Sequence, residues 1–534
     1  MNGGAVARLN SMTDEFEPVS VSRRISVPAR SIFQILASPA RHPDFDGSGM
    51  LRGAVTTSTV SGTGDIFVMK MHYSELGDYQ MNNHVVEYEE DRRIGWEPEP
   101  GRGHPRAGQS GSAGGHRWSY QLTPDGTDAT IVTEIYDCSR APEDRRRGMD
   151  DGKIWVDCMT RTLERLDRLC EDEKLRPFRI AVPDGELADL RDRLDRVRWA
   201  PEPRGGDQGY GVSLAFVRRL VAHWRERYDW RAWESRINEY PQFITTIDGA
   251  GVHFMHVRSP EPDPLPLVLS HGWPGSVAEY LDVIGPLSDP RRHGLDPAIA
   301  FDLVIPSLPG FGWSGPTPDV GWSPRRIAAA WAVLMRRLGY RRYGAAGNDW
   351  GAFISPELGQ LAPDEVVGVH VTQVFPAGPG EVRNASYGHV HAEQPQTLAH
   401  ALADSPVGLL AWNSQVMTGL DPDALLTHVT IHWLTGTAGS APRIYAEEDR
   451  QQPPSGPATI PPGLPVPLGL AQFPHDWPSD RALAERQGAP ILSWNVYDRG
   501  GHYAARQAPD LLVQDMREFF ARCRSTPLQP GSGS

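Results

Sequence analysis

The sequence predicts an α/β protein in which a smaller α+β domain precedes a larger domain built on a mostly parallel sheet. Between residues 265 and 520, short apolar runs that suit buried strands alternate with helical patterns. That order is typical of a parallel sheet with helices on both faces. Before residue 174 the order is instead a strand, a helix, six strands and a long helix. A chain of 534 residues is long enough for two or three separate hydrophobic cores.

Composition argues against several functional classes. Hydrophobic residues make up 39% of the chain and charged residues 22%, as in folded globular proteins. The formal charge of -14 disfavours nucleic acid or an anionic membrane as a partner, and no apolar run approaches the ~20 residues of a membrane span. Residues 1–19 lack the apolar core of a signal peptide, which predicts a cytoplasmic protein. Scattered cysteines predict free thiols and no zinc site: Cys138, Cys158, Cys170 and Cys523.

The first domain alternates strongly between apolar and polar residues. A strand is predicted at residues 19–27 and a helix at residues 29–38, followed by a Gly, Pro and Ser-rich loop at residues 97–115. A helical period predicts one long helix over residues 142–173, with an apolar side formed by Ile154, Trp155, Cys158, Met159, Leu163, Leu166 and Leu169. The remaining strands are predicted at residues 52–60, 65–73, 79–89, 93–96, 117–122 and 130–136.

This order of elements, with the segment SPARHPDFDGSG at residues 38–49, resembles the START-like or SRPBCC fold of polyketide cyclases, aromatases and lipid-transfer proteins. The resemblance implies a helix-grip arrangement, in which a curved antiparallel sheet wraps the C-terminal helix and leaves an apolar cavity. No catalytic dyad stands out here, so we expect a module that holds or presents a ligand. Side chains that could line the cavity, or simply pack in the core, are Met69, Met71, Tyr73, His84, Trp96 and Trp118.

The segment YGAAGNDWGAF, residues 343–353, places Asp349 between two glycines where a small-residue run gives way to a helical pattern. It resembles the nucleophile elbow of the α/β-hydrolases, with aspartate in place of serine. A carboxylate that attacks carbon forms an alkyl ester, so Asp349 suits an epoxide or an alkyl halide rather than an amide or a carboxylic ester. Alone, the segment could be an ordinary Gly/Asn/Asp turn.

The segments before the elbow strengthen this interpretation. A buried strand at residues 265–270 ends at HGWPGS, residues 271–276. In α/β-hydrolases the loop after this strand and the residue after the nucleophile each supply an oxyanion-hole N–H, which implies Trp273 and Trp350. A strand at residues 301–306 separates the two segments. Upstream, we predict helices at residues 184–197 and 213–228 with Asp184 and Ser213 as N-caps, and strands at residues 243–247 and 252–257.

Between residues 375 and 469 the regular alternation lapses. Pro-rich stretches alternate there with helical runs at residues 395–403 and 422–434, which is typical of a cap inserted over a site. The segments SYGHV and APRIY resemble the two cap segments of microsomal-type epoxide hydrolases that carry acidic tyrosines. The resemblance implies that Tyr387 and Tyr445 donate hydrogen bonds to an epoxide oxygen and protonate it as the ring opens.

A candidate base lies near the end of the chain. The predicted strand at residues 491–496 is followed by GGHYAA, so His502 occupies the position of the α/β-hydrolase base. Asp476, in the segment QFPHD, occupies the position of the acidic partner that fixes the imidazole tautomer. Asp480 and Asp498 remain alternatives to Asp476.

Together, HGWPG, GNDWG, both tyrosine segments, FPHD and GGHYAA resemble the microsomal or juvenile-hormone type of epoxide hydrolase over residues 175–523. The resemblance implies an α/β-hydrolase fold with a helical cap, conversion of an epoxide to a vicinal diol through an ester on Asp349, and no metal or organic cofactor. The cap is short near residues 376–386 and 415–425, and the START-like domain is an addition to the family pattern. Both features favour a bulky or polycyclic, polyketide-like epoxide.

Three alternatives stay open. A haloalkane dehalogenase would share the aspartate but would use halide-stabilising Trp or Asn side chains, and an epoxide-opening cyclase would use an internal hydroxyl in place of water. A ligand-binding protein would use no chemistry. For the epoxide hydrolase prediction itself, a homodimer is an open possibility. The predicted boundaries are 1–173 for the START-like domain, 174–260 for an N-terminal meander, 261–374 and 470–525 for the hydrolase core, 375–469 for the cap, and 526–534 for a flexible tail.

Overall fold

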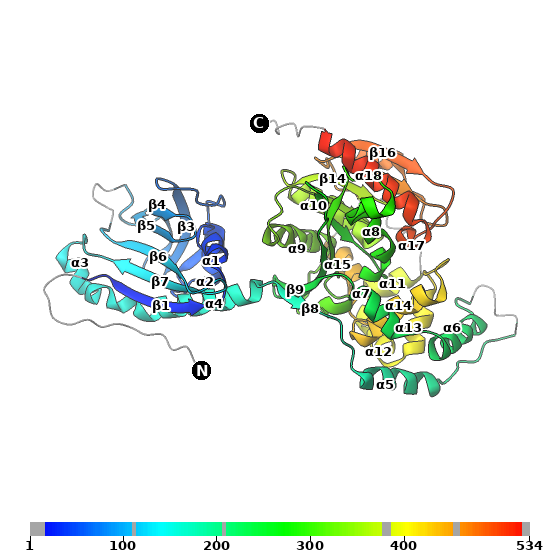
Figure 1. Cartoon of the computed structure of the whole chain (residues 1–534). Helices are drawn as coiled ribbons and strands as arrows, with labels where there is room; N and C mark the ends of the chain where they lie inside the picture. The colour runs from blue at the N-terminus through cyan, green and yellow to red at the C-terminus, as the bar shows by residue number, and fades with distance from the viewer. Residues whose placement is uncertain (1–16, 109–113, 205–209, 376–385, 452–459, 526–534) are drawn as a thin grey trace. The chain divides into compact units, whose positions relative to one another are not determined.

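The computed structural model describes residues 17–108, 114–204, 210–375, 386–451 and 460–525, and it divides into the compact units Met1–Lys174 and Leu175–Ser534 (Figure 1). Residues 1–16, the predicted tail at 526–534 and the predicted short cap segment at 376–385 lie outside the described residues. None of the helices within the described ranges combines the length and the apolar character that a membrane span requires.

The first unit is an antiparallel sheet packed against one long helix. Its strands lie in the order β1-β7-β6-β5-β4-β3-β2. The helix α4 (Val156–Glu173) packs on the sheet through the buried side chains Met159, Leu163 and Leu166. The strands are β1 (Val19–Ile25), β2 (Leu51–Ala54), β3 (Ile66–Tyr73), β4 (Gly77–Glu89), β5 (Arg93–Pro100), β6 (Arg117–Pro124) and β7 (Thr130–Asp137), and the short helices are α1 (Ala29–Leu36) and α2 (His42–Phe45).

Several predicted boundaries in this unit are wrong. The helix predicted over 142–173 is interrupted, because Asp151 and Gly152 have φ of 48° and 91°, which an α-helix cannot accommodate. It consists of α3 (Glu143–Gly148), a 3-10 turn (Asp150–Trp155) and α4, and Ile154 points to solvent. The strand predicted at 52–60 ends at Ala54, after which Val60 N–H donates to Ala37 O instead. Strand β5 continues to Pro100, into the predicted loop.

A cavity of about 370 Å³ lies between the sheet and α4 of the first unit. Met69, Met71, Trp96 and Trp118 line it, as the sequence suggested. Tyr73 and His84 do not. The Tyr73 side chain is exposed, and His84 Nε2 lies 2.9 Å from Glu99 Oε2 in a half-exposed pair.

The second unit is built on one sheet that is parallel over most of its width, in the order β16-β15-β14-β13-β11-β12-β10-β9-β8. Strands β8, β9 and β10 pair antiparallel at one side, and β11 to β16 pair parallel. The bounds are β8 (Arg176–Phe178), β9 (Gln242–Ile247), β10 (Ala250–Val257), β11 (Leu265–Ser270), β12 (Phe301–Pro306), β13 (Tyr343–Gly347), β14 (Val366–Val371), β15 (Leu468–Gln472) and β16 (Ile491–Val496).

Helices cover both faces of this sheet (Figure 1). The core on one face includes α9 (Pro324–Arg337) and α10 (Trp350–Leu361), and the core on the other includes α8 (Leu281–Ser288), α17 (Ala504–Gln507) and α18 (Pro509–Ser525). Buried apolar strands between the two cores explain why β11, β12 and β14 read as nearly continuous hydrophobic runs.

The residues between β14 and β15 form a helical cap. Its helices are α11 (Ser386–Glu393), α12 (Pro395–Asp404), α13 (Pro406–Ser414), α14 (Pro422–Leu434) and α15 (Arg443–Gln451). Figure 1 shows α5 (Asp184–Asp195) and α6 (Leu214–Glu226) beside these helices, and Leu190, Leu220 and Trp224 share an apolar cluster with Leu410 and Leu426. The N-terminal segment of this unit therefore braces the cap.

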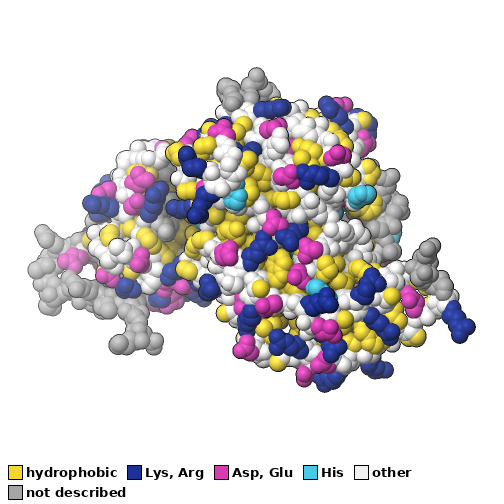
Figure 2. Space-filling model, turned by 45° about the vertical axis from the view of Figure 1, so that its right-hand side comes forward, with side chains coloured by type: hydrophobic (Ala, Val, Ile, Leu, Met, Phe, Trp, Pro, Cys, Tyr) yellow, Lys and Arg dark blue, Asp and Glu magenta, His cyan; other side chains and the backbone are white. Residues whose placement is uncertain are grey.

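The two predicted N-caps have different outcomes. Ser213 Oγ accepts from Phe216 N–H at 3.3 Å, so it caps α6 as predicted. Asp184 is instead the first residue of α5, and Pro183 is the N-cap; the Asp184 carboxylate pairs with Arg231. On the face shown in Figure 2, basic and acidic side chains are interspersed rather than gathered into a field of one sign.

Candidate active site

Asp349 stands on a strained turn between β13 and α10. Its φ of 55° and ψ of -118° are unfavourable for a residue with a side chain. The flanking glycines make the turn feasible. A Cβ on Gly351 would lie 1.8 Å from Ser270 O, and a Cβ on Gly347 would lie 2.2 Å from Gly351 O. The sequence thus forms the sharp strand-to-helix turn that the GNDWG segment predicted.

Backbone N–H groups surround one side of the Asp349 carboxylate. Trp273 N–H donates to Asp349 Oδ1 at 2.8 Å, and Trp350 N–H also hydrogen-bonds the carboxylate. A Cβ on Gly272 would lie 2.1 Å from Oδ1, so glycine is needed for this close approach. Burial raises the pKa of Asp349, while His502 and the two N–H donors oppose the rise. Both predicted oxyanion-hole donors therefore face the predicted nucleophile.

His502 lies between two carboxylates. Its Nδ1 is 2.8 Å from Asp476 Oδ1, and its Nε2 is 3.6 Å from Asp349 Oδ2. Burial lowers the pKa of His502, but Asp476 and then Asp349 raise it more strongly, to about 9. Asp480 instead caps α16 (Arg481–Arg486) by accepting from Leu483 N–H, and Asp498 is exposed. Asp476 is therefore the aspartate that the fold brings to the imidazole.

The two cap tyrosines reach the same place from α11 and α15. Their ring centroids are 6.2 Å apart, and the Trp273 ring lies 5.2 Å from Tyr387 and 6.0 Å from Tyr445. Burial raises the pKa of each tyrosine, and Asp349 contributes to both shifts. Both phenols therefore stay protonated, as hydrogen-bond donors must.

A cavity of about 300 Å³ opens beside these groups. Asp349, His502, Asp476, Tyr387 and Trp273 line it, together with Val416, Thr418, His475, Trp477 and Pro478. Two lining residues, Val416 and Thr418, come from the described segment where the sequence predicted a shortened cap. A carboxylate, an imidazole and a phenol thus share one space large enough for a small organic molecule.

The sequence analysis did not identify Gln373, whose side chain hydrogen-bonds both Asp349 and Asp476. Asp349 N–H donates to Gln373 Oε1 at 2.9 Å, and Gln373 Nε2 donates to the Asp476 carboxylate and to Asn348 Oδ1. Gln373 is fully buried. It lies two positions after β14, at the same edge of the sheet as Asp349, and that placement is the only signal in the sequence that could have identified it.

Two further buried side chains, Glu279 and His391, lie next to the site. Glu279 accepts from Asn348 Nδ2 at 2.8 Å, and burial raises the pKa of Glu279 to about 7. His391 lies among the aromatic rings of the cap: its ring centroid is 4.5 Å from that of Trp273 and 4.8 Å from that of Tyr445. Trp412 Nε1 donates to His391 Nε2 at 2.9 Å. These contacts fix the walls around the tyrosines.

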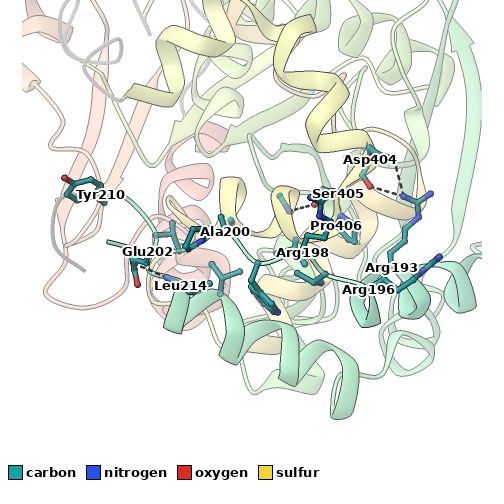
Figure 3. Close-up of a pocket in the computed structure, with 18 of the residues that line it drawn as sticks. Arg193, Arg196, Arg198, Ala200, Glu202, Tyr210, Leu214, Asp404, Ser405 and Pro406 are labelled. Atoms are coloured by element: carbon teal, nitrogen blue, oxygen red, sulfur yellow. Dashed lines mark hydrogen bonds and ion pairs between the residues drawn. The ribbon is translucent and has the colours of Figure 1, made fainter. Parts of the chain in front are cut away.

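A larger hollow of about 870 Å³ lies elsewhere in this unit, beside α5, α6 and the turn between α12 and α13 (Figure 3). Two of the three arginines that line it pair with neighbouring acids: Arg193 pairs with Asp189 and Asp404, and Arg196 pairs with Asp192. No residue of the predicted site lines it. The larger volume of this hollow therefore does not identify the active site, because the predicted catalytic residues line the smaller cavity.

Comparisons with known proteins agree with this geometry. Residues 175–280 match the family described as the epoxide hydrolase N terminus, and residues 266–450 match the alpha/beta hydrolase fold. A protein of Stigmatella aurantiaca whose name includes the words epoxide hydrolase is 39% identical over 381 residues, which cover 65% of this chain and 85% of the relative. Epoxide hydrolase 1 of Sus scrofa is 31% identical over 406 residues, which cover 66% of this chain and 89% of the relative.

Solved structures of epoxide hydrolases also align with this chain. The epoxide hydrolase of Aspergillus niger aligns with a TM-score of 0.58 and 28% identity, over 66% of this chain and 97% of that one. The juvenile hormone epoxide hydrolase of Bombyx mori aligns with a TM-score of 0.58 and 26% identity, over 66% of this chain and 95% of that one. The chain therefore belongs to the epoxide hydrolase family of the α/β-hydrolase superfamily.

Proposed function

We propose that the second unit opens an epoxide to a vicinal diol in two steps, through an ester on Asp349. The observation that carries the proposal is the asymmetric setting of one carboxylate. Asp349 Oδ1 accepts from Trp273 N–H, whereas Oδ2 faces His502 at 3.6 Å. Oδ2 is thus the oxygen available for attack, and Oδ1 already lies where negative charge would be stabilised.

In the first step, Asp349 Oδ2 attacks an epoxide carbon while Tyr387 and Tyr445 hydrogen-bond the ring oxygen. The C–O bond of the ring breaks as the new C–O bond to Asp349 forms, and a tyrosine proton moves to the departing oxygen. The product is a glycol monoester of Asp349. The proximity of the Tyr387 and Tyr445 rings supports a shared role for the two phenols.

In the second step, His502 takes a proton from water, and the hydroxide attacks the carbonyl carbon of the ester. Negative charge develops on Asp349 Oδ1, where the Trp273 and Trp350 N–H groups stabilise it. Collapse releases the diol and restores the carboxylate, and the proton gained by His502 returns through solvent to the tyrosinate left by the first step. Asp476 orients the imidazole and stabilises its cation. General-base assistance of this kind contributes roughly 10²- to 10⁴-fold.

For the substrate, we propose a bulky or polycyclic epoxide of the natural-product type. Support comes from aromatic walls around the cavity, which include Trp273, Tyr387 and Trp477. We also propose that the first unit is a START-like module that holds a ligand. Its antiparallel sheet, the long helix α4 and the cavity of about 370 Å³ between them support that assignment.

A single-turnover experiment in H₂¹⁸O tests the two-step scheme, with enzyme in excess over styrene oxide. The first diol should contain ordinary oxygen taken from Asp349, and label should enter the diol only in later turnovers. In parallel, His502→Gln should accumulate enzyme carrying one substrate mass on the peptide that contains Asp349. Label in the first diol would instead mean that water attacks the epoxide directly.

The same assay separates the alternatives. A cyclase would incorporate no label from water in any turnover, and a dehalogenase would release chloride from test chloroalkanes. Asp349→Ala, compared with wild type for diol formation, tests the ligand-binding alternative. Equal background rates in the two proteins would remove the proposed chemistry altogether.

A further inference from the structure

Glu134 is a carboxyl group buried in the first unit, and none of the ion pairs among the described residues includes it. It lies on the inward face of β7, directly opposite Tyr120 on β6, and both side chains are almost fully buried. Tyr120 Oη donates to Glu134 Oε1 at 2.9 Å. Glu134 Oε2 has no hydrogen-bond partner in the part of the chain that the structure describes. A buried polar atom without a partner costs free energy and calls for an explanation.

Both residues line the cavity between the sheet and α4. Six of the twelve methionines in the chain also line it: Met50, Met69, Met71, Met81, Met149 and Met159. Methionine side chains are flexible and polarisable, so they adapt to ligands of different outline. Such a concentration would be unusual for a core whose only task is to pack.

Aromatic rings supply the rest of the wall. Trp118 lies 4.6 Å from Tyr136 and 5.8 Å from Trp155 between ring centroids, and Trp96 stacks on His42 at 5.2 Å. His42 is neutral at physiological pH, because burial lowers its pKa to about 4. A flat apolar molecule would therefore find ring surfaces on several sides.

We propose that the first unit has its own small-molecule site, in which Glu134, positioned by Tyr120, hydrogen-bonds the acceptor oxygen of a neutral, ring-containing ligand. The volume of about 370 Å³ suits a molecule of that size. This inference deepens the ligand-holding proposal for the first unit, and it does not depend on the chemistry proposed for the second.

The polarity of the ligand follows from the protonation of Glu134. Burial raises the pKa of Glu134 to about 8, and the nearby Asp46 adds to the rise, while the Tyr120 hydrogen bond opposes it. At neutral pH the group is mainly the acid, which can donate one hydrogen bond. A ketone, ether or epoxide oxygen would accept it, whereas a carboxylate ligand would be disfavoured in this apolar setting.

A matched pair of probes tests the inference: 2-acetylnaphthalene, which has an acceptor oxygen, and 2-ethylnaphthalene, which has none. Equilibrium dialysis with the full chain should show about 2- to 10-fold tighter binding of the ketone, the range for one net hydrogen bond. The double variant Tyr120→Phe/Glu134→Leu should lose that preference, because it removes the anchor without leaving an unpaired phenol. Glu134→Gln should keep it, since the amide retains a donor.

Two controls locate the binding. Glu75→Leu removes a carboxyl from an exposed turn of the same unit and should leave the preference unchanged. Tyr387→Phe/Tyr445→Phe should also leave it unchanged. If this variant alone abolished the preference, the ketone would bind in the second unit and the inference would be wrong, with the proposed hydrolysis unaffected.

Hydrogen exchange of the wild-type chain gives a readout that needs no substitution. The ketone should slow exchange of the amides of β6 and β7 relative to the ethyl compound. Protection confined to residues 175–525 would overturn the inference even if the double variant failed to fold.

Discussion

The charge on His502 depends on Asp349 as well as on Asp476. Asp476 and then Asp349 raise the pKa of the imidazole, Glu279 adds to the rise, and together these groups outweigh the lowering effect of burial. In the proposed first step Asp349 becomes a neutral ester, so its contribution to the raised pKa disappears. His502 should then release its proton more easily, at the stage where the proposed mechanism needs a neutral base.

Asp349→Asn should lower the pKa of His502 below the wild-type value of about 9, because the amide copies the neutral ester in shape. Titration by NMR of the imidazole resonances measures it. Asp480→Asn is the matched control: Asp480 caps α16 and does not contact His502, so the pKa should not move. An equal pKa in Asp349→Asn and wild type would contradict the coupling.

The same pKa has a consequence for stability. A histidine whose pKa is raised in the folded state stabilises the fold fully below its unfolded pKa near 6.5, and that contribution is lost as the pH rises through about 9. The advantage in unfolding free energy of wild type over Asp349→Asn should therefore fall as the pH rises from 6.5 to about 9.

Local sequence was enough to identify the residues that stand on turns with a fixed pattern. Asp349, Trp273 and His502 follow strand ends and have glycines beside them, which the chemistry of a sharp turn requires. Gln373 could not be found that way, because three of its four hydrogen-bond partners come from other segments and no turn residue marks it. Glu134 was missed for the same reason: its partner lies across the sheet on β6.

At the scale of elements, the elbow depends on backbone segments that nearly touch. Strand β11 passes so close to the start of α10 that only glycine fits at position 351. The contact is with the carbonyl oxygen of Ser270, which belongs to the sheet and cannot rotate away. The strained φ of Asp349 is therefore maintained by the packing of β11, β13 and α10 together.

Gly351→Ala should lower the free energy of unfolding by about 1–3 kcal/mol or more, because the new methyl group forces β11 and α10 apart. Chemical denaturation measures the loss, and diol formation should fall as well. Gly185→Ala is the control. It lies in the first turn of α5 with no atom within 4 Å of the new Cβ, so it should be neutral or slightly stabilising. Equal stabilities of the two variants would contradict this account of the elbow.

Element boundaries were predictable where burial is uniform. The strands at 265–270 and 301–306 were predicted to the residue, since a run of buried apolar residues between turn signals has few alternatives. The helix over 142–173 was wrong because the left-handed residues Asp150, Asp151 and Gly152 interrupt it, and aspartate at positive φ leaves no periodic trace.

At the scale of the whole molecule, the two units have separate hydrophobic cores. Leu166 belongs to the core under the antiparallel sheet, and Leu267 belongs to a core of the parallel sheet. Both side chains are fully buried. On the face in Figure 2, side chains of opposite charge are interspersed and form no patch of one sign.

Separate cores predict separate unfolding transitions in differential scanning calorimetry. Leu166→Ala and Leu267→Ala should each cost about 2–5 kcal/mol, but in different units, so each should lower one transition and leave the other in place. The two variants serve as controls for each other. One transition that moves equally in both would mean that the units unfold as a single cooperative body.

The two Asp349 oxygens have different partners, and in the proposed scheme only one of them is exchanged with solvent. In the proposed scheme Oδ2 leaves with every molecule of diol, and an atom from solvent takes its place, whereas Oδ1 stays bonded to the same carbon behind the Trp273 amide for the lifetime of the protein. Each turnover would thus replace one oxygen atom of the Asp349 carboxylate and leave the other in place.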